Sequence, residues 1–277
     1  MKTSLFSGMF KDDPIGASFE QAAKIGYDAV EIYTRFHLEE TATPAEAAEI
    51  KAMAADNGVA ISLVYTGIGG AILSGEEQRA KDLATAERFL DLGDALGCNM
   101  VKVGAGRRAD GVYDEGEART IADWLAAVCD KAAAHDARIL AELHRGQYFE
   151  TVDMARRMID LIDRSNFGVI HDAGNLHICG SIYREDSVDV LGDRIFHVHV
   201  KDMVKLPDDS KEGNLYPAGR FTRALLNEGN VDYLALLRGL AKIDFQGYLS
   251  CEASGGDDPV SVAKHEMAEM KRLFAQI

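Results

Sequence analysis

Four side chains of the kind that bind metals or transfer protons stand at the ends of short apolar runs in this sequence. They are Glu142, Asp172, His199 and Glu252. Runs of this length and composition are typical of the buried strands of a parallel sheet. The carboxyl ends of parallel strands meet on one face of a barrel, which is where catalytic side chains gather. We therefore expect these four side chains to converge on one point.

The run Ile195–Val200, followed by Lys201, has the most unusual pattern. A period of two places Phe196 on an apolar face and places His197, His199 and Lys201 on the opposite face. Imidazole and ammonium groups are rarely buried without a partner or a metal. The pattern predicts that His199 faces the converging carboxylates and that His197, one layer deeper, is a hydrogen-bonded core residue.

The predicted cluster requires a cation. Burial and mutual repulsion would raise the pKa values of three neighbouring carboxyl groups, and a divalent metal ion removes that conflict. Three carboxylates with one imidazole favour Mn²⁺, Mg²⁺ or Co²⁺, and Zn²⁺ is also compatible. A single strand-end carboxylate is more often solvated. Four matched positions on successive strands instead favour one divalent metal ion bound by Glu142, Asp172, His199 and Glu252.

The elements that must position these residues are short apolar runs that alternate with segments of helical period. The predicted strands are Leu5–Met9, Ala29–Tyr33, Ala60–Tyr65, Met100–Gly104, Ile139–Leu143, Phe167–Ile170, Ile195–Val200 and Tyr248–Cys251. The predicted helices are Ser18–Ile25, Ala45–Asn57, Glu76–Leu96, Glu117–His135, Thr151–Ile162, Val231–Ile243 and Val260–Phe274. Strands that alternate with helices in this way predict an α/β fold, a single (β/α)8 TIM barrel over residues 1–277. A doubly wound open sheet is the alternative, but no glycine-rich phosphate-binding motif follows the first strand.

Signals at the joints support this division. Thr43-Pro44 and Asp258-Pro259 each combine a capping residue with proline at the first helical position. Glycines that follow predicted helices, and for which we expect a left-handed conformation, are Gly26, Gly58 and Gly97. The longest segment between strands, Met203–Asn230, shows little helical pattern. Because loops after barrel strands build the active-site face, it is a candidate lid, and a surface insertion without a role is the alternative.

Composition excludes several classes of function. The chain has 30 basic and 45 acidic residues, and its net charge of −15 argues against nucleic acid as a partner. The four cysteines are widely spaced, which is typical of the reduced thiols of a cytoplasmic protein. No apolar run approaches about 18 residues and no signal-peptide pattern opens the chain, so we expect no membrane segment. We predict a cytoplasmic protein that acts on a small molecule, and a homo-oligomer is compatible with the sequence.

The motifs that carry these residues are similar to those of a known superfamily. Glu142-Leu143-His144, Asp172-Ala173-Gly174-Asn175, the run from His197 to Asp202 and Glu252 resemble the xylose-isomerase-like TIM-barrel superfamily, and more narrowly its sugar (phosphate) isomerase/epimerase branch. The resemblance covers nearly the whole chain, and the His-x-His-x-Lys-Asp run is its most specific part. It implies that the four residues named above bind one divalent metal ion. It also implies that Glu142 and Glu252 are catalytic acid/base groups on opposite sides of the substrate.

Further polar residues are candidates for substrate contact. The resemblance implies such a contact for His144, although a core position is the alternative. Asn175 stands where several relatives carry histidine, and it is a candidate contact to a sugar hydroxyl. Lys201 is expected either to contact a substrate oxygen or to pair with a carboxylate. Glu31 and Lys102 share inward parity, so they either form a buried ion pair under the site or leave Glu31 to bind substrate.

The predicted function is a divalent-metal-dependent isomerase or epimerase of a small sugar or keto-polyol. A glutamate would remove the proton beside a carbonyl group to form an enediolate. Proton return gives isomerisation or epimerisation, whereas loss of a β-hydroxyl gives dehydration, so an inosose-type dehydratase is the alternative. An AP-endonuclease-like hydrolase would need further zinc-binding histidines, where this chain has Thr66, Gly104 and Asn175. A non-catalytic sugar-binding barrel would have no reason to keep four converging ligands.

Overall fold

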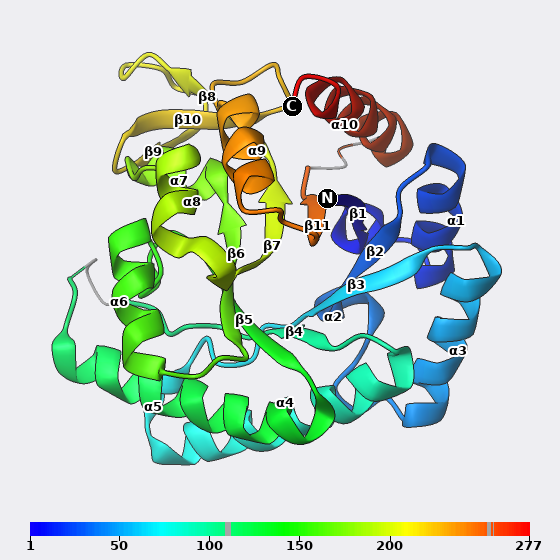
Figure 1. The fold of residues 1–277 in the computed structure, drawn as a ribbon, viewed down its shortest axis with the longest axis vertical. Helices are drawn as coiled ribbons and strands as arrows, with labels where there is room; N and C mark the ends of the chain where they lie inside the picture. Colours follow the sequence, from blue (N-terminus) through cyan, green and yellow to red (C-terminus); the bar gives the residue numbers. More distant parts are fainter. Residues whose placement is uncertain (109–111, 254–255, 257) are drawn as a thin grey trace.

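Eight parallel strands close into a barrel in the computed structural model, which describes residues 1–108, 112–253, 256 and 258–277 (Figure 1). Each strand of the barrel neighbours the next one along the chain, and the last pairs with the first. The strands are β1 (Lys2–Phe6), β2 (Ala29–Tyr33), β3 (Ala60–Tyr65), β4 (Met100–Lys102), β5 (Arg138–Glu142), β6 (Phe167–Asp172), β7 (Ile195–Val200) and β11 (Tyr248–Cys251). The predicted (β/α)8 TIM barrel is confirmed.

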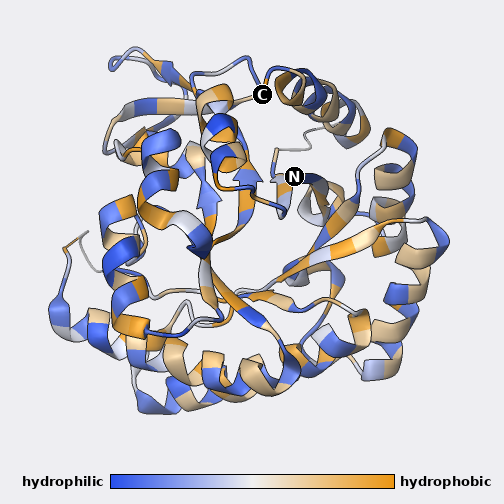
Figure 2. Cartoon of the chain, in the orientation of Figure 1, coloured by the Kyte–Doolittle hydropathy of each residue, from blue (hydrophilic) through white to orange (hydrophobic). Residues whose placement is uncertain are grey.

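Helices form a ring outside the strands, as Figure 1 shows. They are α1 (Ile15–Ile25), α2 (Thr34–His37), α3 (Pro44–Asp56), α4 (Glu76–Leu96), α5 (Glu115–Ala132), α6 (Val152–Ile162), α7 (Ala173–Cys179), α8 (Glu185–Leu191), α9 (Tyr233–Lys242) and α10 (Pro259–Phe274). The helices mix hydrophilic and hydrophobic residues (Figure 2), as expected where one face of each packs on the sheet. None of the described helices is long and apolar enough to cross a membrane.

The predicted signals at the helix ends are confirmed. The Thr43 side chain accepts a hydrogen bond from the backbone N–H of Glu46 at 3.2 Å, and proline follows at the first position of α3. Asp258 caps α10 in the same way through the N–H of Ser261 at 3.0 Å. The expected left-handed φ angles, +97°, +70° and +71°, occur at Gly26, Gly58 and Gly97.

The first strand begins earlier than the apolar pattern predicted. β1 covers Lys2–Phe6, and Ser7–Phe10 forms a short 3₁₀ turn. The reason is a buried polar pair, because the Ser4 hydroxyl lies 2.7 Å from the hydroxyl of Ser62 on β3. A strand whose polar side chains have hydrogen-bond partners on a nearby strand does not need an unbroken apolar run.

A β-bulge opens β7. The register between β6 and β7 shifts between Val169 and Ile170, which leaves an extra residue on β7. Phe196 therefore packs with Leu140 and Ile170 inside the barrel, and its predicted place on the opposite face from the histidines is wrong. Beyond the bulge the alternation resumes, and it keeps His199 pointed into the barrel, where it meets a carboxylate of β2.

The segment between β7 and α9 folds into a three-stranded antiparallel sheet, at the upper left in Figure 1. Its strands, in the spatial order β8-β10-β9, are β8 (Asp202–Leu206), β10 (Gly219–Ala224) and β9 (Asn214–Tyr216). The sheet is docked on α7, because the ring of Phe221 lies 5.3 Å from that of His177 and the backbone N–H of Ala218 donates to Ile178 at 3.0 Å. We call it the inserted sheet.

Asp202 holds the return from the inserted sheet to α9. Its Oδ2 accepts hydrogen bonds from the backbone N–H groups of Asn227 and Gly229, at 2.9 and 3.0 Å. Its Oδ1 accepts from Met203 and Val231 at 2.8 and 3.0 Å. The aspartate of the His-x-His-x-Lys-Asp run is therefore a buried organiser of this loop.

Glu266 ties α10 to the same loop and predicts a pH dependence of stability. Its Oε1 accepts a hydrogen bond from the backbone N–H of Leu226 at 2.9 Å, whereas Oε2 has no partner among the described residues. Burial raises the pKa of Glu266 to about 7, against the opposing effect of this N–H. A carboxyl group whose pKa is raised on folding stabilises the fold fully below its ordinary pKa of 4.5, and this contribution is lost as the pH rises to about 7.

We expect the pH to change the difference in unfolding free energy between the wild type and Glu266→Gln. Between about pH 4 and pH 8 it should shift in favour of the variant by roughly 3 kcal/mol, because the neutral amide has no proton to lose. Urea unfolding at both pH values measures it, with the exposed Glu49→Gln as the control. A difference that does not change with pH would contradict the assignment.

Candidate metal centre

Glu142, Asp172, His199 and Glu252 lie together at the carboxyl end of the barrel. Sheet register brings them there, since Asp172 on β6 pairs beside His199 on β7, and His199 pairs with Ser250, two residues before Glu252. One oxygen or nitrogen atom from each of the four lies within 4.8 Å of the others. The chain thus brings together all four predicted ligands, in an arrangement that could hold a metal ion.

The imidazole of His199 lies at the centre of this cluster. Its Nδ1 is 3.4 Å from Glu142 Oε1, 3.8 Å from Asp172 Oδ2 and 3.3 Å from Glu252 Oε2. This Nδ1 is buried, yet it makes no aligned hydrogen bond to any described residue. A buried nitrogen aimed between three carboxylate oxygens fits a divalent cation, which would take all four as ligands.

Glu31 supports His199 from below. Its Oε1 lies 3.0 Å from His199 Nε2 and its Oε2 lies 2.9 Å from His197 Nε2. Glu31 is fully buried, so both of its oxygens are committed to imidazoles and neither faces a substrate. The expected substrate contact of Glu31 is therefore not what the geometry provides. A carboxylate that receives the outer N–H of a ligand histidine orients the ring toward the metal.

The pair formed by Glu31 and His199 leads to a prediction about metal affinity. Burial would raise the pKa of Glu31, but the imidazoles of His199 and His197 lower it to about 2, so it is ionised. Glu31→Gln should weaken Mn²⁺ binding by about 10- to 100-fold, because an amide cannot accept from both rings as a carboxylate does. Titration calorimetry measures this, with the exposed Glu39→Gln as the control. Equal affinities in the two variants would contradict the supporting role.

Asn175 orients two of the four residues. Its Nδ2 donates to Asp172 Oδ2 at 2.9 Å and lies 3.2 Å from Glu142 Oε1, and it also donates to the carbonyl oxygen of Leu143. Asp172 in turn caps α7, because its Oδ1 accepts the backbone N–H of Asn175 at 2.8 Å. Asn175 is 5% exposed, and its amide protons serve the acidic cluster, which leaves them unavailable for the expected sugar hydroxyl.

Tyr65 is a member of the site that the sequence reasoning did not select. Its hydroxyl donates to Glu142 Oε2 at 2.5 Å, and its ring stacks on His199 with centroids 5.7 Å apart. Burial, reinforced by the charge of Glu142, raises the pKa of Tyr65 well above its ordinary value, so the phenol keeps its proton. The sequence could have identified it, because Tyr65 is the last residue of β3 and faces the barrel interior like Leu63, two residues earlier.

Lys201 places an ammonium group among the carboxylates. Its Nζ lies 2.7 Å from Asp172 Oδ2, 2.6 Å from Glu252 Oε2 and 3.8 Å from Glu142 Oε1. Of the two expected roles, the geometry provides the pairing with carboxylates. Burial alone would lower the pKa of Lys201, but these three charges raise it above its ordinary value.

Electrostatics keep Glu142 and Glu252 ionised despite their burial. Burial raises the pKa of Glu142, but the neighbouring His199, His144 and Lys201 hold it well below its usual range. The pKa of Glu252 is likewise lowered, because Lys201 and His199 outweigh the effect of burial. Burial would lower the pKa of His199, and the surrounding carboxylates raise it well above its ordinary value. In this metal-free arrangement His199 and Lys201 therefore balance the carboxylates, and a divalent ion that took His199 as a ligand would displace its proton.

Residues 19–273 match the family model described as xylose isomerase-like TIM barrel. The chain belongs to this family. The match confirms the resemblance predicted from the motifs at Glu142, Asp172 and His199.

Two curated relatives in this family are dehydratases. The 3-dehydroshikimate dehydratase of Pseudomonas aeruginosa is 28% identical over 235 residues, which are 84% of this chain and 35% of that protein. The inosose dehydratase of Clostridium perfringens is 27% identical over 176 residues, which are 60% of this chain and 57% of that protein. This chain therefore spans about a third of the first relative and somewhat over half of the second.

A solved structure of similar fold is the IOLI protein with a bound zinc atom. Its TM-score is 0.83 at 18% identity, over 100% of this chain and 99% of that one. At this identity the likeness concerns the fold.

Two further residues singled out in the sequence, His144 and Lys102, lie near the centre of this xylose isomerase-like barrel. His144 lies partly exposed just past β5, where its Nδ1 is 2.8 Å from the carbonyl oxygen of Arg145, so it lies at the mouth as expected. Lys102 does not form the ion pair with Glu31 that was one of two expectations. Its Nζ instead donates to the carbonyl oxygen of Thr66 at 3.2 Å and lies over the Tyr65 ring.

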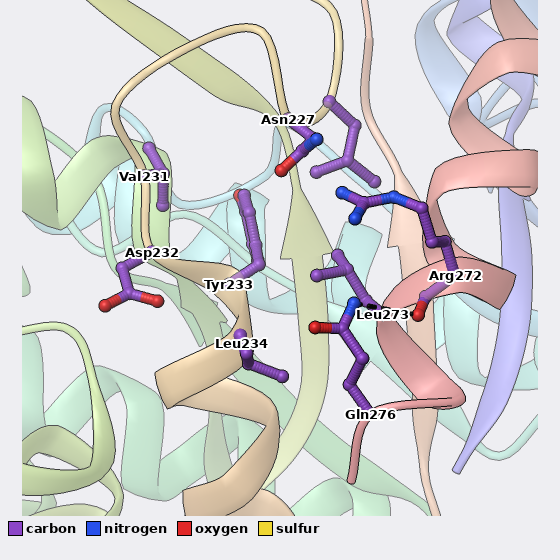
Figure 3. Close-up of a pocket in the computed structure, with 9 residues that line it drawn as sticks. Asn227, Val231, Asp232, Tyr233, Leu234, Arg272, Leu273 and Gln276 are labelled. Atoms are coloured by element: carbon purple, nitrogen blue, oxygen red, sulfur yellow. Dashed lines mark hydrogen bonds between the residues drawn. The ribbon is translucent and has the colours of Figure 1, made fainter.

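The pocket drawn in Figure 3 is separate from the metal centre. It has a volume of about 160 Å³ and lies between the start of α9 and the end of α10, where Asn227, Tyr233 and Arg272 line it. Tyr233 connects the two regions, because its hydroxyl donates to the carbonyl oxygen of Lys201 at 2.8 Å and accepts from the Lys201 N–H at 2.9 Å. This tyrosine therefore fixes the backbone that carries Lys201.

Proposed function

We propose that this protein is a divalent-metal-dependent dehydratase that removes water from a small polyhydroxylated ketone. The observation that carries the proposal is the unpartnered Nδ1 of His199 aimed between the oxygens of Glu142, Asp172 and Glu252. The similarity to a 3-dehydroshikimate dehydratase and an inosose dehydratase supports loss of a β-hydroxyl as the outcome. A divalent ion held by these four residues would polarise the ketone oxygen and stabilise the negative charge that develops on it.

The side chains of this chain supply the proton transfers. Glu252 is the most exposed of the three carboxylates, with 18% of its side chain accessible. Its Oε2 contacts Lys201, and its Oε1 lies 3.6 Å from Arg223 Nη2. Because the pKa of Glu252 is lowered, it is ionised and can accept the proton beside the carbonyl group. The same group then returns this proton to the departing hydroxyl, which leaves as water. Glu142 is held in place by Tyr65 and Asn175, and it approaches the same Nδ1 of His199 as Glu252 does.

A sugar isomerase or epimerase, the activity predicted first from the sequence, is the second candidate. It starts with the same proton removal and differs in where the proton returns. The observation that favours it is the presence of two ionised glutamates, Glu142 and Glu252, beside one His199. A proton taken by one glutamate and returned by the other would invert or isomerise the substrate without loss of water.

A substrate panel in D₂O tests both candidates. The protein is stripped with a chelator and reloaded with Mn²⁺, Mg²⁺, Co²⁺ or Zn²⁺. It is then given 3-dehydroshikimate, an inosose, L-ribulose 5-phosphate and D-tagatose. A dehydratase gives a conjugated product that absorbs in the ultraviolet, whereas an epimerase gives deuterated, rearranged sugar. Neither product nor deuterium exchange with any metal would overturn the proposal.

A further inference from the structure

The inserted sheet brings one cation, Arg223, to the edge of the proposed metal centre. Its Nη1 donates to the carbonyl oxygen of Glu252 at 2.7 Å, and its Nη2 lies 3.6 Å from Glu252 Oε1. These are its polar partners among the described residues. The side chain is 44% exposed, so its other N–H donors are accessible beside the carboxylate proposed as the base.

The inserted sheet holds Arg223 in a fixed position. Arg223 lies on β10 and pairs with Met203 of β8, the residue that follows Asp202. Phe221, two residues earlier on the same face, is buried against α7. Because the inserted sheet is docked in this way, the guanidinium needs no ordering of a loop to reach the site. It is a pre-positioned group.

The charges around the centre leave Arg223 without a full counter-charge. The site holds four carboxylates and two ammonium groups, which are Glu31, Glu142, Asp172, Glu252, Lys102 and Lys201. A divalent ion would cancel the formal excess of two negative charges. Arg223 then adds one positive charge at the mouth of a protein whose net charge is −15. Such a chain would otherwise repel an anionic ligand.

We propose that Arg223 binds an oxyanion group of the substrate, a carboxylate or a phosphate, attached close to the reacting carbon. This rests on the proposed function, and it restricts the substrate class of the same site. A guanidinium offers parallel N–H donors that match the two oxygens of a carboxylate or phosphate, which an ammonium group cannot do. An uncharged sugar or inosose offers no partner of this kind.

Arg223 also touches Glu252, so a purely positioning role must give a different result. If Arg223 only oriented Glu252, its replacement would lower kcat for charged and uncharged substrates alike. If it binds the substrate anion, replacement raises KM for charged substrates and leaves uncharged ones unaffected. A conservative Arg223→Lys variant keeps the charge and loses the paired donors, so it should fall between the wild type and Arg223→Gln.

Two matched pairs of non-reacting probes test anion binding without turnover. Catechol and 3,4-dihydroxybenzoate share two adjacent ring oxygens and differ by a carboxylate, while glycerol and glycerol 1-phosphate differ by a phosphate. Calorimetry with the Mn²⁺-loaded wild type should give roughly 10- to 100-fold tighter binding of one charged member over its partner. Arg223→Gln should abolish this ratio. Arg220→Gln, on the opposite face of the same strand, should keep it.

The outcomes separate this inference from the proposed function. Equal binding of charged and uncharged probes by the wild type, or a ratio that survives in Arg223→Gln, overturns the inference even where the enzyme turns over a ketone. A ratio that depends on Arg223, in a protein with no turnover or exchange, supports the anion site and overturns the proposed reaction. A ratio in the catechol pair alone indicates a carboxylate on the substrate, and a ratio in the glycerol pair alone indicates a phosphate. An equal fall in kcat for charged and uncharged substrates assigns Arg223 to the positioning of Glu252 and overturns the anion site.

Discussion

Replacing Glu252 with glutamine is expected to lower turnover by about 10²- to 10⁴-fold, the usual contribution of a positioned general base. The amide has the size of the carboxylate but cannot accept a proton. Deuterium exchange beside the carbonyl group should fall by the same factor, because exchange and dehydration share the first step. Steady-state kinetics and NMR exchange on one Mn²⁺-loaded sample measure both quantities. Glu228→Gln, exposed on the loop before α9, is the control.

Because Glu252 is also a proposed ligand, the experiment must separate base from ligand. Metal content is therefore measured in each variant, and the kinetics are run at saturating Mn²⁺. Glu142→Gln sharpens the comparison, since Tyr65 and Asn175 hold that carboxylate and would retain the amide in place. In an epimerase it would keep exchange and lose product, whereas in a dehydratase exchange and product would change together. A metal-loaded Glu252→Gln that turns over normally would remove Glu252 from the mechanism.

The four residues of the centre could be predicted because strand geometry is simple at the carboxyl end of a barrel. Glu142 and Asp172 end their strands, and Glu252 follows one directly, so alternation alone decides that they face the mouth. His199 was predicted with them although a bulge precedes it. The bulge displaced Phe196, whereas the residues after it recovered the alternation. The alternation of side chains along β7 was therefore sufficient to predict the direction of the residues that follow the bulge.

The contacts of Glu31 and Arg223 could not be predicted, because their partners come from distant parts of the chain. Glu31 on β2 bridges two histidines of β7, which are 166 and 168 residues away along the chain. The alternation along β2 shows that the Glu31 side chain faces inward, but it does not show how deep in the barrel the side chain lies. Arg223 reaches Glu252 only because the segment after β7 pairs with itself as an antiparallel sheet. Glycines and prolines hide that pairing in the sequence. Tyr65 could have been found, since its inward parity was readable.

Lys201→Met is expected to destabilise the metal-free protein by about 3–5 kcal/mol, the cost of leaving a buried charge without its partner. Lys201 Nζ is the cation nearest to Asp172 Oδ2 and Glu252 Oε2 in the described part of the chain, at 2.7 and 2.6 Å, and its side chain is 6% exposed. Without it, the carboxylates can relieve their repulsion only by taking up protons. Urea unfolding in the presence of a chelator measures the loss. Lys205→Met, an exposed change of the same kind, should stay within about 0.5 kcal/mol of the wild type.

The same variant should recover when metal is added. A divalent ion would neutralise the carboxylates that Lys201 leaves behind, so saturating Mn²⁺ should stabilise Lys201→Met more than it stabilises the wild type. Because folding raises the pKa of Lys201 above 10.5, its contribution is fully present below that pH and is lost only as the pH rises beyond it. The gap between variant and wild type should therefore be equal at about pH 7 and pH 8. A gap of the same size with and without Mn²⁺ would mean that the ion does not bind among these carboxylates.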